Sequence, residues 1–213
     1  MPVWQALREE LKDKNFEVIT VACESKGAPA ALPFVQAANQ QHPSLLDEHH
    51  RMPELYNTKN VPAAFWIDEG GRILRANDPI YAQRRNRETG EVTTNHKYLN
   101  ALRDWVEKGP RSHYIQDQQG VEARRGVQTW EDVQARAFFR LGLHLHRQGH
   151  VQDAIVHFKR AHALRPNDWN YKRQAWNLGN VEKDYGTTLA DARKDPASEP
   201  FYLPLDLPEP SQA

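Results

Sequence analysis

Thiol chemistry in this chain would depend on a single side chain. Cys23 is the one cysteine among 213 residues, which excludes an internal disulfide and a zinc site of several cysteines. A reactive thiol needs a nearby cation or helix N-terminus to form the thiolate, and only Lys26 is close in sequence. Because Cys23 ends an apolar run, where a lone cysteine is most often inert, we expect a core residue rather than a redox thiol.

Histidines supply the other side chains that could hold a metal. They form two clusters: His49 and His50, then His144, His146, His150 and His157. His144 and His146 are two positions apart and point to different faces of a helix. Gly149 interrupts the helical pattern between His146 and His150. No acidic residue stands at helical spacing beside them, so we predict solvated histidines and no metal site.

Charge and hydropathy exclude several classes of partner. Lys plus Arg and Asp plus Glu both number 28, which gives no electrostatic reason to expect nucleic acid. The basic pairs within residues 84–87 and 124–125 therefore read as solvated charge. Apolar runs are only a few residues long, so no membrane span is expected. The first residues alternate with charge rather than forming a signal peptide, so the chain reads as cytoplasmic, with its compartment left open.

Strands and helices alternate through the first half of the chain, which predicts an α/β region. The run 16–22, "FEVITVA", is β-branched and mostly apolar, as in a strand buried on both faces, and 62–68, "PAAFWID", is similar. A turn at 69–71 makes 72–76 the antiparallel partner of that second strand. Helical patterns cover residues 1–14, 29–40, 50–57 and 95–109, a short strand or extended segment is expected at 43–48, and a loop at 78–94.

The second half of the chain predicts helices alone. Residues 110–130 read as a polar linker, and strong helical patterns follow at 131–148 and 151–165, with a weaker one at 168–184. Five prolines after residue 186 oppose regular structure, so the tail is either disordered or laid over the surface. The predicted units are therefore 1–109, a linker at 110–130, a helical region at 131–185 and a tail at 186–213.

Residues 1–109 resemble a thioredoxin-like domain of the TlpA/ResA-type thiol-disulfide oxidoreductases and their redoxin relatives, related to AhpC/TSA. The segments "FEVITVACESKG" (16–27), "HPSLLDE" (42–48) and "LYNTKNVPAAFWIDEGGRI" (55–73) carry the resemblance. It implies a cis peptide bond between Val61 and Pro62 that faces the redox site. The Val61 backbone would then pair with a protein or peptide thiol or disulfide substrate. Without the resemblance, Pro62 reads as a trans proline that opens an edge strand.

The same resemblance gives Glu24 a role. It matches an acidic residue that this family keeps near its reactive cysteines, where a partly desolvated carboxyl has a raised pKa and relays protons to a thiol. A solvated glutamate at the end of a strand fits the sequence equally well.

The reactive motif of that family, W-C-x-x-C, is absent from the chain. The predicted helix is already under way at residue 1 and has no N-cap residue ahead of it, although Val3, Trp4, Leu7 and Leu11 share one face. Two explanations stay open. A CxxC motif, or one with selenocysteine whose codon is taken for a stop, lies upstream of Met1 and leaves the chain as given inactive. Alternatively, this is a natural non-catalytic thioredoxin-like module.

The missing motif implies a missing strand as well. In the family this strand lies between 16–22 and 63–67, so each of those strands would lose a neighbour and keep an unpaired edge. A gap of roughly 9–10 Å should then separate them, unless they collapse together. Because a central strand is rarely deleted from a core, the upstream motif is the favoured explanation.

Residues 135–168 resemble one tetratricopeptide repeat. The matching positions are Phe138, Leu141, Gly142, Leu145, Ala154, Phe158, Ala161 and Pro166. An isolated repeat is too small to be stable, so the hairpin should dock on the helix 168–184, on the first region or on a second subunit. The resemblance implies either a groove for a protein partner or a structural extension that buries its own surface. The two resemblances together imply a thioredoxin-like redox protein, either a thiol-disulfide oxidoreductase or a peroxide-handling redoxin. The alternative is a non-catalytic protein-interaction module, and neither implies a cofactor.

Overall fold

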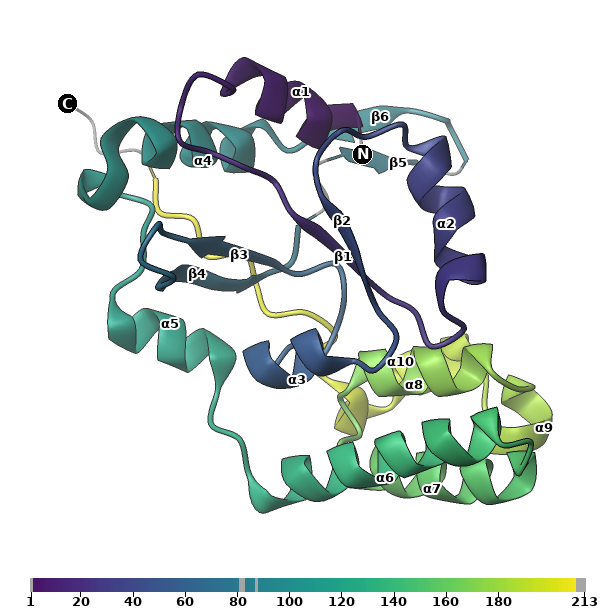
Figure 1. Ribbon diagram of the computed structural model, residues 1–213. Helices are drawn as coiled ribbons and strands as arrows, with labels where there is room; N and C mark the ends of the chain where they lie inside the picture. The colour runs from purple at the N-terminus through teal and green to yellow at the C-terminus, as the bar shows by residue number, and fades with distance from the viewer. Residues whose placement is uncertain (1, 81–82, 87, 210–213) are drawn as a thin grey trace.

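The computed structural model describes residues 2–80, 83–86 and 88–209 (Figure 1). Helices and strands alternate in its first part. These elements are α1 (Pro2–Glu10), β1 (Thr20–Cys23), α2 (Ala28–Ala37), β2 (Ser44–Asp47), α3 (Arg51–Tyr56), β3 (Ala64–Ile67), β4 (Ile73–Asp78), β5 (Gln83–Arg85), β6 (Val92–Thr94) and α4 (His96–Lys108). Helices alone follow: η1 (Gly109–Arg111), α5 (Gln118–Arg125), α6 (Trp130–Arg147), α7 (Val151–Leu164), α8 (Trp169–Asn177), α9 (Val181–Tyr185), α10 (Leu189–Lys194) and η2 (Pro196–Ser198).

The strands form three small sheets rather than one. β1 pairs with β2 in parallel, from Thr20 opposite Ser44 to Cys23 opposite Asp47. β3 and β4 form the predicted antiparallel hairpin, and β5 pairs with β6. No ladder joins β1 to β3, so within the described residues each of these strands keeps one unpaired edge. The two strands have therefore not collapsed into a single sheet.

The first strand differs from its prediction. β1 begins only at Thr20, its four residues are half-buried, and Ile19 just before it is 60% exposed. The expectation of a strand buried on both faces is wrong. An apolar strand is buried on both faces only when neighbours flank it and helices cover it, and β1 pairs with β2 alone.

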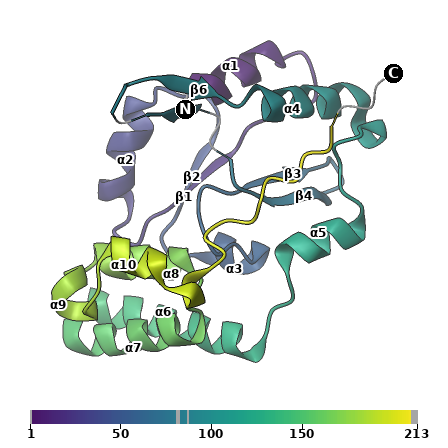
Figure 2. The same cartoon turned by 180° about the vertical axis from the view of Figure 1, so that it is seen from behind.

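The core of the first part lies where α1, α4 and β3 meet. The helix face predicted from Leu7 and Leu11 is buried there, together with Trp66 of β3 and Tyr98 of α4. The Trp66 indole N–H donates to the Tyr98 hydroxyl at 2.8 Å. This bond satisfies a polar group that would otherwise be buried without a hydrogen-bond partner. The helices α1 and α4 lie side by side in both views (Figures 1 and 2).

The segments predicted as linker and loop both contain regular structure. The segment expected as a polar linker contains α5, which packs against β4 and buries only Val121. The segment expected as a loop contains the β5–β6 hairpin. Arg87 and the side chains of Arg84 and Arg85 lie outside the described residues.

The second part is built around an antiparallel pair of helices, α6 and α7. Thr129 caps α6 in a capping box with Asp132. Phe139 and Phe158 pack across the seam with ring centres 5.5 Å apart. Gly142 allows this approach, because a Cβ there would lie 2.6 Å from the Phe158 ring. α8 closes the hairpin from the side by packing Tyr171 on Phe139 with ring centres 4.3 Å apart.

The chain after α8 departs from prediction in two respects and resolves an open alternative in a third. The tail expected to lack regular structure contains α10, capped by Thr188, and the short η2. The helix expected over 168–184 is broken into α8 and α9, with Asn180 capping the second. The proline-rich tail, as far as residue 209, lies over the surface rather than being left loose (Figure 2). Leu207 joins the first core, and Asp206 offers its carbonyl to the buried Arg75.

Candidate functional site

Cys23 lies at the end of β1 with its thiol held protonated. Burial raises its pKa to about 12, and the nearby Asp47 carboxylate acts in the same direction. Lys26, the cation closest in sequence, instead donates to the side chain of Asn177 at 3.2 Å. A thiol in this state is a weak nucleophile at neutral pH.

Glu24 faces the helical region. One of its carboxylate oxygens accepts from the Lys26 backbone N–H at 2.9 Å and from the Asn177 amide at 3.3 Å. The carboxylate therefore fixes the turn after β1 and also contacts α8. The Glu24 carboxylate can accept hydrogen bonds, but both donors that contact it belong to this chain and neither belongs to a substrate.

The Val61–Pro62 peptide bond is cis, as the resemblance implied. The backbone expected to pair with a substrate peptide is already occupied. The Val61 carbonyl accepts from the Arg173 guanidinium at 3.2 Å and from the Tyr202 hydroxyl at 2.5 Å, while its N–H donates to the Asn60 side chain at 3.0 Å.

α8 is the element that brings the predicted site residues together. Arg173 contacts Val61, Gln174 contacts Cys23 and Asn177 contacts Glu24. The candidate site is therefore the junction at which α8 covers the end of β1 and the loop before β3.

Backbone hydrogen bonds hold the start of α8 on this loop. The N–H groups of Trp169 and Asn170 donate to the Lys59 carbonyl at 2.7 and 3.1 Å, and the Asn170 amide donates to the Thr58 carbonyl at 2.7 Å. One loop carbonyl thus satisfies two amides of the first helical turn, which otherwise have no partner.

A buried arginine fixes the same junction from the other side. The Arg165 guanidinium lies 3.2 Å from both Asp132 and Asp168 and donates to Asn57 at 3.1 Å. Burial raises the pKa of Asp168 to about 6, although the Arg165 charge acts against that rise. Since a buried charge without its partner is costly, this network specifies how the two parts dock.

His50 is fully buried, so the expectation of a solvated side chain is wrong here. Its Nε2 lies 2.8 Å from the Ser25 hydroxyl, its ring packs edge-on against Phe139, and burial lowers its pKa to about 4. Serine and histidine at this distance could act as nucleophile and base. Ser25, however, is only 7% exposed, so a substrate could not reach its hydroxyl, and the pair joins the turn after β1 to α6.

Further expectations of solvated side chains are corrected by the structure. Arg125 is half-buried and donates to the Leu55 carbonyl, and half-buried His146 has its Nε2 3.1 Å from the Leu178 carbonyl. Arg124 is half-buried and donates to the carbonyls of Ala76, Asn77 and Pro204. His157 is half-buried and stacks on Phe138. Among the described residues, no three His, Cys, Asp or Glu side chains are placed to share a metal ion, and no helix is long and apolar enough to cross a membrane.

Sequence reasoning missed Arg173, Gln174, Asn177 and Tyr202. The first three lie in the stretch "WNYKRQAWN", where polar residues interrupt the aromatic positions, whereas Tyr202 lies in the tail and has no such signal. Such a pattern suits a helix that docks through hydrogen bonds as well as apolar contacts.

Comparison with known proteins identifies the helical hairpin. The tetratricopeptide repeat family matches residues 135–168, which covers most of α6 and all of α7 and ends at Asp168, the N-cap of α8. This match confirms the repeat predicted from sequence. No curated protein and no solved structure matches the chain.

Proposed function

We propose that this protein is an interaction module that binds a protein partner through its tetratricopeptide repeat. The observation that carries the proposal is an uncovered apolar stripe on α6. Trp130, Val133 and Leu141 are 68%, 40% and 41% exposed, and their spacing places them on one face of the helix. Apolar side chains gathered on one exposed face mark interaction surfaces more often than scattered ones do.

The repeat architecture explains why that face is free. Each repeat buries its flanks on its neighbours, and about three are normally needed for stability. Here α8 covers one flank of the hairpin, where Phe139 stacks on Tyr171, and α3 packs near the same side. We therefore assign the opposite flank to a protein segment that presents apolar side chains, with a second copy of this chain as the competing occupant.

Site-specific photo-cross-linking in the native cells tests this proposal. A photoreactive phenylalanine at position 130 should trap a defined protein, and Leu141→Asp should abolish the adduct. The matched control places the same group at Leu189 of α10, which is 43% exposed but lies off the repeat. Equal labelling from positions 130 and 189, or an adduct that survives Leu141→Asp, would contradict the proposal, and an adduct with itself would identify a homodimer.

The second candidate is a thioredoxin-like redox scaffold. The separation of β1 from β3 supports it, since each strand keeps an edge on which an intervening strand could pair. This candidate needs that strand and a dithiol, and the described residues supply neither. Glu24 would then relay protons, and the Val61–Pro62 backbone would contact a thiol or disulfide substrate once α8 and Tyr202 moved aside.

The N-terminus of the protein isolated from its own cells decides between the two. Mass spectrometry should find residues ahead of Met1, including two cysteines or a cysteine with selenocysteine, if the redox candidate is correct. A mature chain that begins at Met1 would exclude it and leave the interaction module unaffected.

A further inference from the structure

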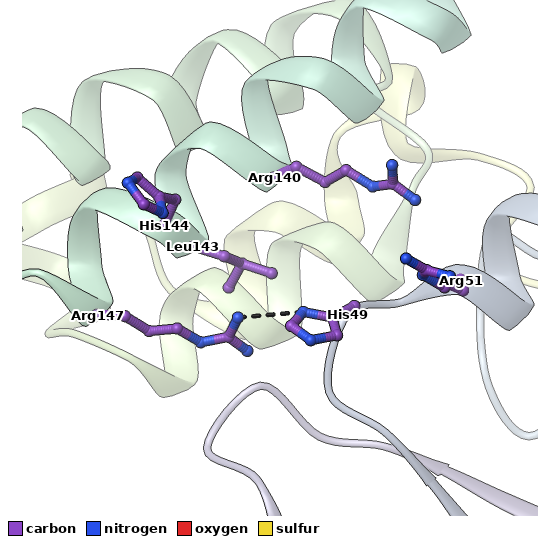
Figure 3. A pocket seen from close by; sticks show the side chains of 6 residues that line it. All are labelled: His49, Arg51, Arg140, Leu143, His144 and Arg147. Carbon is purple, nitrogen blue, oxygen red and sulfur yellow. Dashed lines mark hydrogen bonds between the residues drawn. The ribbon is translucent and has the colours of Figure 1, made fainter.

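A small basic pocket lies between the two parts of the chain (Figure 3). Its volume is about 280 Å³, and it is lined by His49, Arg51, Arg140, Leu143, His144 and Arg147. The α6 residues follow the i, i+3, i+4 and i+7 spacing of one helix face. The other two come from the end of β2 and the start of α3, so the pocket exists only when the two parts are docked.

One of the three pocket arginines is already neutralised. Arg140 grips the Glu54 carboxylate with two nitrogens, and its Nε donates to Oε1 at 3.0 Å. Glu54 is buried beneath it, and Arg136 approaches the same carboxylate at 3.7 Å. Arg140 therefore forms a wall of the pocket, and little of its charge is free for a ligand.

The other two arginines retain their charge. Within the part of the chain that the structure describes, neither Arg51 nor Arg147 forms an ion pair, and Arg51 is exposed. Arg147 donates only to neutral acceptors, the His49 Nδ1 and the Glu48 carbonyl, each at 3.1 Å (Figure 3). Because a guanidinium only donates, this bond leaves the neutral His49 ring with its proton on Nε2, as a further donor.

The nearest carboxylates form no ion pair with these two arginines among the described residues. Asp47 accepts from the backbone N–H groups of His49 at 3.3 Å and Met52 at 2.7 Å. The Glu48 carboxylate lies beside Gly27, where a Cβ would be 2.8 Å from it, on the side of the turn after β1. Two guanidinium groups without a paired carboxylate, together with the His49 Nε2 donor, thus line one small space.

We propose that this pocket binds a phosphate dianion, either free or as a small phosphate monoester. Two uncompensated guanidinium groups match its charge, and arginine forks are suited to bidentate contacts with phosphate oxygens. Leu143 offers an apolar wall to the carbon that carries the phosphate. Drug-sized ligand pockets start at roughly 300 Å³, so the space suits a phosphoryl group with a short substituent rather than a nucleotide.

Calorimetric titration of the full chain with inorganic phosphate, and separately with O-phosphoserine, tests the proposal at fixed ionic strength. Arg51→Gln should weaken binding about tenfold, since a hydrogen bond between charged groups contributes about that factor. Arg111→Gln is the matched control, because this exposed arginine on η1 has the same charge and does not line the pocket. Arg147→Gln should act like Arg51→Gln, and if it loosens the docked parts, Arg51→Gln alone carries the test.

The outcomes separate the two sources and the alternatives. Binding of O-phosphoserine more tightly than inorganic phosphate assigns the pocket to a monoester, and the reverse order assigns it to the free ion. The proposal is overturned if neither binds, if acetate binds as well as phosphate, or if Arg51→Gln and Arg111→Gln weaken binding equally.

Discussion

The side-chain amide of Gln174 donates to the Cys23 carbonyl at 3.0 Å, although the two residues are 151 positions apart in sequence. The oxygen of the same amide accepts from the Ser25 backbone N–H at 2.8 Å. Gln174 thus satisfies the backbone on both sides of Glu24, in the way that a neighbouring strand would. The helical region is therefore joined to the end of β1 by a side chain that bonds to the main chain of the strand and of the turn after it.

Gln174→Ala should weaken this junction. Losing both hydrogen bonds should lower the free energy of unfolding by about 1–3 kcal/mol, because it leaves two half-buried backbone groups unpaired. Urea denaturation measures the loss, and amide hydrogen exchange should speed up at Ser25. Gln119→Ala on the exposed face of α5 is the control and should match the wild type. Identical midpoints for the two variants would show that α8 docks without Gln174.

Gly142→Ala should destabilise the helical hairpin. The added Cβ would lie 2.6 Å from the Phe158 ring, so α6 and α7 must move apart. Overpacking of this kind costs about 1–3 kcal/mol. Gly120→Ala in α5 is the matched control, since its new Cβ meets only side chains of Gln116 and Asp117 at 3.2–3.3 Å. A thermal melt compares them, and equal melting temperatures would contradict the close approach at Gly142.

Acid should destabilise the protein through its buried histidines. Burial lowers the pKa of His162 to about 4, well below its ordinary value of 6.5. The unfolded chain therefore takes up the proton first, so this contribution to stability is complete above about pH 6.5 and is lost as the pH falls through about 4. His50 acts in the same direction, since its pKa is also lowered to about 4. Asp168 opposes both, because its raised pKa adds stability as the pH falls below about 6.

His162→Phe isolates the contribution of His162 to the pH dependence of stability, since the other titrating groups contribute equally to the variant and the wild type. Between neutral pH and about pH 4.5, the variant should gain about 2 kcal/mol of stability relative to the wild type. Urea unfolding at the two pH values gives this difference. The exposed His96→Phe should keep parallel curves with the wild type, and parallel curves for His162→Phe would refute the shift.

Cys23 should be slow to react. With its pKa raised to about 12, iodoacetamide at neutral pH should modify it at least about a hundredfold more slowly than free cysteine. Concentrated urea should restore the ordinary rate. The chain should also fail to reduce insulin, because one cysteine cannot alternate between dithiol and disulfide within a molecule. Insulin reduction that Cys23→Ser abolishes would contradict both expectations.

Local patterns predicted the elements whose signals are local. The Gly70–Gly71 turn lies between two apolar runs and gives the β3–β4 hairpin, and helical spacing with a break at Gly149 gives α6 and α7. α5 was missed because it buries only Val121, which is too little for a periodic pattern. β1 was predicted too long and too buried because its residues suit a flanked strand, whereas the structure gives it only one partner.

The candidate site was only partly predictable, for a different reason. Cys23, Glu24 and the Val61–Pro62 bond stand in recognisable segments, so sequence could single them out. Gln174 contacts Cys23 only because α8 docks there. The polar and aromatic residues of this helix do not indicate which distant segment it will contact. The same holds for Arg165, whose hydrogen bond to Asn57 joins residues 108 positions apart.

The tail supplies a hydrogen-bond acceptor to a strand that is synthesised much earlier. Arg75 is fully buried in β4, and two of its hydrogen bonds go to backbone carbonyls, one from Tyr114 and one from Asp206. Because the ribosome makes the Asp206 carbonyl more than a hundred residues after Arg75, the hydrogen bonds of this early strand are completed only once residue 206 has been made. A chain that is cut before residue 206 leaves this buried cation short of one acceptor.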